Sequence, residues 1–234
     1  MTDPLRSWSF SGLQVFETCP YWAYLRYGQR IPEPEPPPNA PNVRGSRTHD
    51  EAELFVRGEG PFTPGLAKFE KQFLELKTLF DEGIVELEEN WGVDRSWNSV
   101  EWSDPNCWGR IKLDAFVRTS TTSCRVIDYK TGKSWGNEVK HSQQGSVYGI
   151  AALMRYPELE EVTIEFWYLD EGKCRPKTIS RDKLMKQLPK LNERAVMMTS
   201  VSSFPAKPNK FNCRWCPYRP GKGGQCDLGV DPDS

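Results

Sequence analysis

Two strand-like segments joined by a short polar run constrain the fold more than any other part of the chain. "RIKLDAFV" (110–117) alternates apolar and polar residues, and "CRVIDYK" (124–130) has two β-branched residues before its acid. The run "TSTTS" (119–123) between them is typical of a turn, so the pattern predicts an antiparallel hairpin. Helical periodicity precedes the hairpin at 66–81 and follows it at 138–155 and 180–198. The sequence therefore predicts one mixed α/β domain.

The hairpin places acidic side chains together. Residues two apart on a strand share a face, so Asp128 and Lys130 project together while Tyr129 points away. If Thr121 is the apex of the turn, Asp114 lies opposite Asp128, with the Cβ atoms about 4.5–5.5 Å apart. Carboxylates this close repel unless they share a proton or a divalent cation. The alternative is an exposed polar hairpin whose acids form salt bridges.

Several segments resemble a known nuclease family. "GRIKLDAFV" and, about 14 positions later, "VIDYKTGK" resemble the active-site hairpin of the PD-(D/E)XK nuclease superfamily, especially its RecB-like branch. "RGSRTHDEAE" around His49 resembles the first helix of that branch, and "QQGSVYGIA" resembles its Gln-x-x-x-Tyr helix, with Gln144 and Tyr148. The resemblance implies a restriction-endonuclease-like mixed sheet flanked by helices.

The resemblance also implies roles for individual residues. The metal ligands would be His49, Asp114, Asp128 and the backbone carbonyl of Tyr129. Lys130 would act in catalysis, supported by Gln144 and Tyr148. Carboxylate oxygens suit Mg²⁺ or Mn²⁺, and a histidine nitrogen shifts the preference toward Mn²⁺.

Cysteines near both ends of the chain carry a second resemblance. "FETCPYWAYL" and the C-terminal cysteines resemble the framework of RecB-family iron–sulphur nucleases, which include small exonucleases of phages and CRISPR adaptation modules. This implies a [4Fe–4S] cluster on Cys19, Cys213, Cys216 and Cys226, although from the local sequence alone zinc would be the default. We expect segments 1–30 and 200–228 to bind the cluster and 43–198 to form the nuclease core, all within a single domain of residues 1–234.

The charge distribution and the N-terminal sequence add to the expected function and location. Residues 171–227 contain thirteen bases and four acids, which fits a polyanionic partner or a solvated helix face. We expect a DNA exonuclease that prefers single-stranded ends and serves recombination, repair or end processing. The alternative is a non-catalytic DNA-end-binding or recombination-partner module. The sequence leaves open whether the protein has partners from recombination or CRISPR adaptation and whether it forms an oligomer. "MTDPLRSWSF" has no signal-peptide core, so we expect the cytoplasm of a bacterial or phage-infected cell.

Overall fold

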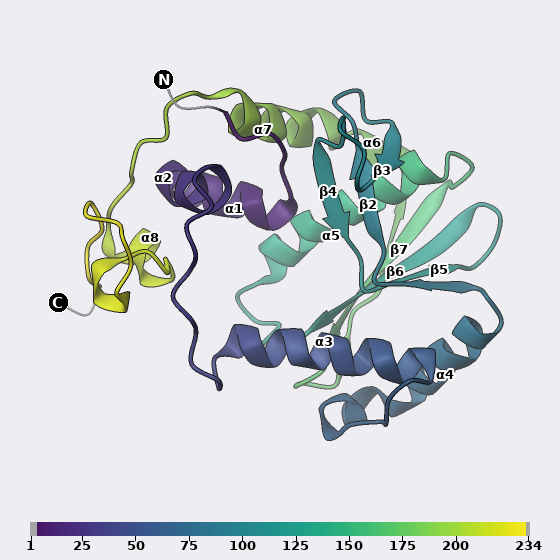
Figure 1. Cartoon of the computed structure of the whole chain (residues 1–234). Coiled ribbons are helices and arrows are strands. Elements are labelled where there is room, and N and C mark those ends of the chain that lie inside the picture. The colour runs from purple at the N-terminus through teal and green to yellow at the C-terminus, as the bar shows by residue number, and fades with distance from the viewer. Residues whose placement is uncertain (1–3, 233–234) are drawn as a thin grey trace. The chain divides into compact units, whose positions relative to one another are not determined.

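The chain divides into two compact units in the computed structural model, which describes residues 4–232 (Figure 1). Unit 1 combines the N-terminal segment up to residue 36 with the C-terminal segment from residue 190 onward. Unit 2 is the continuous segment 37–189. Among the described helices, none is both long and apolar enough to cross a lipid bilayer.

Unit 2 is built on a six-stranded mixed sheet. Its strands run in the order β1-β5-β6-β7-β8, with β9 also paired to β7. The pair β6–β7 is parallel, and the other pairs in this sheet are antiparallel. The strands are β1 (Val85–Leu87), β5 (Ala115–Arg118), β6 (Ser123–Lys130), β7 (Glu161–Tyr168), β8 (Lys173–Cys174) and β9 (Lys177–Ser180).

Helices cover both faces of this sheet (Figure 1). One face packs its apolar residues, among them Tyr129 and Trp167, against α3, η2 and α4. The other face carries α5, which connects the parallel strands β6 and β7 and approaches Ile164 and Phe166 closely at Gly145. The helices are α3 (Pro41–Arg57), the 3-10 helix η2 (Pro64–Phe69), α4 (Glu70–Asp81), α5 (Glu138–Arg155) and α6 (Arg181–Met185). The predicted α/β class with helices flanking a mixed sheet is confirmed.

A smaller three-stranded sheet, in the order β3-β2-β4, corrects one detail of the prediction. Its strands are β2 (Asn90–Val93), β3 (Ser99–Glu101) and β4 (Gly109–Lys112). Residues 110–117, predicted as a single strand, are therefore divided between β4 and β5. The two sheets are joined at this point by two backbone hydrogen bonds. The Glu88 N–H donates to the Asp114 carbonyl, and the Leu113 N–H donates to the Glu89 carbonyl. Two chain segments thus leave one sheet and enter the other together.

Unit 1 is helical and loop-rich. Pro20 occupies the first turn of α2, as its position in the sequence predicts. The predicted helix over 180–198 is in fact two helices, α6 and α7, separated at residues 186–187. The elements of this unit are α1 (Phe10–Thr18), α2 (Pro20–Ala23), the π-helix η1 (Tyr24–Gly28), α7 (Leu188–Ser200), α8 (Lys210–Arg214) and the 3-10 helix η3 (Pro220–Lys222).

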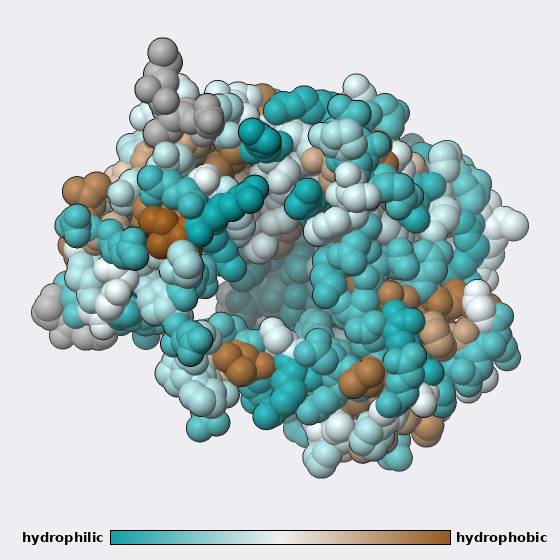
Figure 2. Space-filling model, viewed as in Figure 1, coloured by the Kyte–Doolittle hydropathy of each residue, from teal (hydrophilic) through white to brown (hydrophobic). Residues whose placement is uncertain are grey.

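The surface over α3 and α4 is mainly hydrophilic, with hydrophobic residues that stand apart from one another (Figure 2). Leu54 on α3 is 43% exposed and Leu74 on α4 is 51% exposed. Isolated exposed leucines of this kind are ordinary on soluble domains. The apolar stripes of both helices face the sheet instead.

Candidate active site

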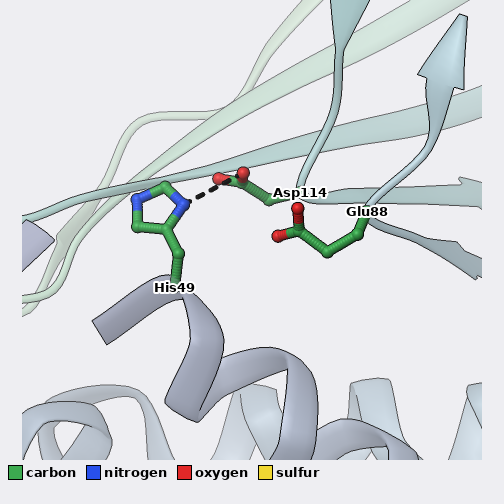
Figure 3. A group of neighbouring side chains, drawn as sticks. All are labelled: His49, Glu88 and Asp114. Atoms are coloured by element: carbon green, nitrogen blue, oxygen red, sulfur yellow. Dashed lines mark hydrogen bonds and ion pairs between the residues drawn. The ribbon is translucent and has the colours of Figure 1, made fainter. Parts of the chain in front are cut away.

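Three side chains with metal-binding atoms meet where the two sheets of unit 2 separate. His49 comes from α3, Glu88 from the connection between β1 and β2, and Asp114 from the connection between β4 and β5. Their ligand atoms all lie within 4.8 Å of one another, and the His49 Nδ1 is 3.1 Å from an oxygen of Asp114 (Figure 3). One nitrogen and carboxylate oxygens form a donor set that suits Mg²⁺ or Mn²⁺.

Burial sets the electrostatics of this group. Burial raises the pKa of Asp114, and the negative charge of Asp128 raises it further, while the hydrogen bond from His49 acts in the opposite direction. Burial lowers the pKa of His49, but the hydrogen bond and charge of Asp114 outweigh that effect and leave it raised. Burial also raises the pKa of Glu88, opposed by Lys112, whose Nζ lies 2.5 Å from a Glu88 oxygen. A cation among these groups would offset the same negative charge.

The strand register predicted from the turn is confirmed. Ala115 pairs with Ile127, and extending this antiparallel register by one residue sets Asp114, just before β5, opposite Asp128 on β6. Asp114 also accepts a hydrogen bond from the Tyr129 backbone N–H at 2.6 Å. The Tyr129 side chain lies in the core with α3 and α4, away from Asp128, as strand alternation predicts.

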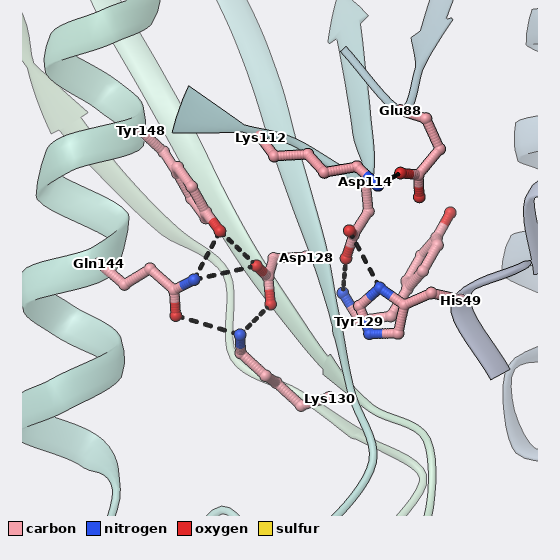
Figure 4. A network of polar contacts seen from close by, with 9 residues as sticks. All are labelled: His49, Glu88, Lys112, Asp114, Asp128, Tyr129, Lys130, Gln144 and Tyr148. Atoms are coloured by element: carbon pink, nitrogen blue, oxygen red, sulfur yellow. Dashed lines mark hydrogen bonds and ion pairs between the residues drawn. The ribbon is translucent and has the colours of Figure 1, made fainter. Parts of the chain in front are cut away.

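A second set of contacts surrounds Asp128 on the α5 side of the sheet (Figure 4). Tyr148 donates a hydrogen bond to Asp128 at 2.6 Å, and the amide of Gln144 lies 3.4 Å from the same oxygen. Lys130 forms an ion pair with the other Asp128 oxygen and donates to Gln144 Oε1 at 3.0 Å. Gln144 and Tyr148 are one helical turn apart on α5, so both face the strand. The structure thus brings Asp128, Lys130, Gln144 and Tyr148 together.

Glu88 was missed by the sequence analysis. The segment 84–91 alternates like a single strand, which makes Glu88 one of several ordinary surface acids. In the structure Glu88 has a φ of 53° and directly follows β1, where the chain passes into the second sheet. A non-glycine residue with positive φ is uncommon and cannot be identified from periodicity. The cluster of acids at 86, 88 and 89 was the available signal.

The four cysteines of unit 1 line one small cavity. Cys19 precedes α2, Cys213 lies in α8, and Cys216 and Cys226 follow in the C-terminal loops. Burial raises the pKa of Cys216 to about 11, and the neighbouring Cys226, Cys19 and Cys213 add to this effect. The predicted convergence of these cysteines is therefore present in the structure.

Glycine explains how Cys226 reaches the other three across a gap of nine residues. The loop after Cys216 folds back so that the Cys226 N–H donates to the Tyr218 carbonyl at 2.8 Å. A Cβ at Gly224 would lie 2.2 Å from the Tyr218 backbone, and Gly223 has a φ of 69°. The close approach of the Gly224 and Tyr218 backbones and the positive φ of Gly223 therefore favour glycine at both positions of the "GKGG" segment.

Comparison with known proteins identifies the fold family. The sequence profile of the PD-(D/E)XK nuclease superfamily matches residues 7–103 and 108–220, which is most of the chain. The chain belongs to this superfamily. The PD-(D/E)XK protein is accordingly a hydrolase of the deoxyribonuclease class, and the predicted superfamily is confirmed. A comparison with curated proteins found no match.

Solved structures share this fold at low sequence identity. A candidate exonuclease from Eubacterium rectale is 12% identical over 90% of this chain and 86% of its own, with a TM-score of 0.54. The crystal structure of a protein named SSO0001 is 13% identical over 99% of this chain and 90% of its own, with a TM-score of 0.47. The first similarity supports the shared fold of this nuclease.

Proposed function

We propose that this nuclease is a metal-dependent DNA exonuclease that prefers single-stranded ends. The observation that carries the proposal is the His49–Glu88–Asp114 donor group beside the Asp128–Lys130 pair, because a phosphodiesterase needs metal ligands and a positive group at one place. The name of the Eubacterium rectale protein supports the exonuclease assignment. We place the activity in DNA recombination, repair or end processing in the cytoplasm of a bacterial or phage-infected cell.

The residues present fit Mg²⁺ or Mn²⁺. We propose His49, Asp114, Asp128 and the Tyr129 backbone carbonyl as ligands, with Glu88 as an additional one. Asp114 is held ready because His49 and the Tyr129 N–H each contact one of its oxygens. When bound, the cation supplies an acidified water and offsets negative charge at phosphorus.

The protein's own residues then perform the positioning. Asp128 and Gln144 hold the Lys130 ammonium between them, so its charge has a defined place before DNA arrives. A preorganised positive charge can stabilise the negative charge that develops on the phosphate and steer the attacking water. Tyr148 donates to Asp128 and restricts the rotation of that carboxylate. Gln144 and Tyr148 are therefore positioning residues in this proposal.

We further propose that Cys19, Cys213, Cys216 and Cys226 bind a [4Fe–4S] cluster. All four cysteines line one cavity, and four thiolates are the ligand set of such a cluster as well as of structural zinc. The resemblance of the cysteine framework to that of RecB-family iron–sulphur nucleases supports the cluster over zinc.

The test is digestion of 5′- and 3′-labelled DNA, single-stranded and double-stranded, with Mn²⁺, Mg²⁺ or a chelator. The expected result is metal-dependent shortening from an end, faster for single strands. Binding without cleavage under every metal condition would favour the alternative, a non-catalytic DNA-end-binding or recombination-partner module. Cleavage of a circular single strand at the same rate would instead indicate an endonuclease.

A further inference from the structure

A cavity of about 410 Å³ lies on the α5 side of the sheet, next to the active site. We call it the β7 pocket. Its floor consists of Ile164, Phe166 and Tyr168, which alternate along β7 and so share one face. Pockets that hold small organic ligands have about this volume and combine an apolar lining with a few polar groups.

Aromatic side chains line part of the β7 pocket. His141 from α5 stacks on Phe166, with ring centroids 5.2 Å apart and planes 27° apart, and its Nδ1 is 2.7 Å from the Tyr168 hydroxyl. Trp135, in the connection between β6 and α5, also lines the cavity and is 82% exposed. Flat apolar rings around one cavity are suited to stacking a nucleobase.

Positive charge lines one wall of the pocket. Lys173 on β8, Arg175 in the connection between β8 and β9, and Lys177 on β9 all belong to the pocket lining. The carboxylate of Glu171 lies 3.1 Å from Lys173 and offsets part of its charge. Glu138 is the acid in the lining, so three cations face one carboxylate. A ligand with an aromatic ring and a negative group matches this wall and floor.

Lys130 connects the β7 pocket to the active site. Its Nζ lies 5.5 Å from the centroid of the Phe166 ring, which forms the pocket floor. In the parallel ladder Asp128 pairs with Phe166 and Lys130 with Tyr168. The pocket and the proposed catalytic pair thus occupy neighbouring strands at the same level of the sheet.

We propose that the β7 pocket binds one unpaired nucleotide of single-stranded DNA beside the phosphate to be cleaved. The base stacks on the exposed ring of Trp135 and contacts Phe166 and His141 where they line the pocket, and a flanking phosphate contacts Arg175 and Lys177. A base within a duplex is paired and stacked, so it can enter this cavity only after leaving the helix, which costs a few kcal/mol. This inference rests on the proposed nuclease function and gives it a structural basis for strand preference.

Binding without catalysis tests the pocket separately from the nuclease. The probe is a fluorescent oligothymidylate of about 12 nucleotides, within the range of single-strand site sizes, titrated with full-length protein in EDTA. Trp135→Ala should weaken binding by about five- to thirtyfold, as expected for one lost stacking partner. Lys177→Glu should weaken binding and flatten its salt dependence, because a phosphate contact is lost. Binding of a blunt duplex should change less in both variants.

Matched controls lie on α4, on the other face of the sheet. Leu74→Ala removes an exposed apolar side chain, and Lys71→Glu reverses an exposed charge; both should bind within about twofold of the wild type, since surface changes away from a site have small effects. Trp135→Phe should restore most of the affinity lost in Trp135→Ala. If Trp135→Ala unfolds, Arg175→Glu replaces it.

The outcomes separate the two proposals. Wild-type affinity in Trp135→Ala and Lys177→Glu, or no single-strand binding by the wild type, would overturn the pocket. If both variants bind single strands like the wild type and the wild type cleaves DNA, only the pocket proposal fails and the nuclease proposal survives. Weakened binding in the pocket variants of a protein that cleaves nothing would keep the pocket and remove the catalytic role. In an active enzyme, the pocket variants should raise KM for single strands more than they lower kcat.

Discussion

Lys130 is held by two neighbours before any substrate arrives. Asp128 forms an ion pair with its ammonium group, and Gln144 accepts a hydrogen bond from it at 3.0 Å. The same contacts mean that removing either partner changes the position of the other. In particular, Asp128→Ala removes a proposed metal ligand and also releases Lys130. Both losses act on the reacting phosphate in the proposed mechanism.

We therefore expect Asp128→Ala and Lys130→Ala each to lower the nuclease rate by at least about a hundredfold, as for the loss of a metal ligand or of a preorganised charge. The measurement is the single-turnover cleavage rate of end-labelled DNA at saturating Mn²⁺, with circular dichroism to confirm folding. Lys71→Ala, an exposed lysine on α4, is the matched control and should leave the rate unchanged. Wild-type rates in folded Asp128→Ala protein would refute the assignment.

Substitutions of His49 and Glu88 should change the metal concentration that the reaction requires. Each is one ligand among several, so His49→Ala or Glu88→Gln should raise the Mn²⁺ concentration needed for half-maximal rate, while DNA binding in chelator stays close to that of the wild type. Loss of the nitrogen ligand should impair the reaction with Mg²⁺ most.

Glu89→Gln is the control for Glu88, since it changes the adjacent acid in the same way. Metal titrations of His49→Ala that overlay those of the wild type would make His49 a packing residue. The same result for Glu88→Gln would leave Glu88 as the partner of Lys112 alone.

At the scale of elements, periodicity predicted which side chains share one face of the hairpin. It did not predict that residues 110–117 are divided between two sheets. The register that sets Asp114 opposite Asp128 followed from alternation and turn length, both of which are local. The break at residues 113–114 depends on hydrogen bonds to residues 88 and 89, more than twenty positions earlier. Glu88 escaped prediction for the same reason. Non-local pairing leaves no trace in a short window of sequence.

Helix α5 positions Gln144 and Tyr148 through a close approach to β7. A Cβ at Gly145 would lie 2.9 Å from a methyl group of Ile164 and 3.4 Å from the Phe166 ring. Gly145→Val should therefore push α5 outward and destabilise the fold by about 1–3 kcal/mol through overpacking, although valine has the better helix propensity. Cleavage should fall as Gln144 and Tyr148 move with the helix.

The control for Gly145→Val is Gln143→Val, which places the same side chain at an exposed position of α5. Urea denaturation measures the stability of both variants, and the cleavage rate is measured well below the unfolding midpoint. Equal stability and activity in the two variants would show that α5 tolerates displacement and that its side chains do not position Asp128.

At the scale of the whole molecule, the described N-terminal and C-terminal segments share unit 1, as the cysteine resemblance implies. Residues from both ends line the cavity that contains Cys19, Cys213, Cys216 and Cys226. The spacing of Cys213 and Cys216 indicated a chelating pair, whereas the choice of Cys19 as a partner came from the resemblance to iron–sulphur nucleases. Spacing alone could not distinguish iron from zinc, since four thiolates suit either centre.

A centre shared by Cys19 and Cys226 closes a loop of about two hundred residues, and a cross-link of that length stabilises the folded state by about 5 kcal/mol on the loop-entropy model. Metal binding adds to stability when the unfolded chain has no site.

We expect anaerobically purified protein to be brown, with about four irons and four sulphides per chain, as in a [4Fe–4S] centre. Cys19→Ala should lower the melting temperature and reduce cleavage indirectly, whereas Cys174→Ala, a partly buried cysteine of unit 2, should retain the full iron content. One zinc and no iron would replace the cluster with a structural zinc site. A Cys19→Ala protein that is metal-free, as stable as the wild type and fully active would show that the ends of the chain need no such link.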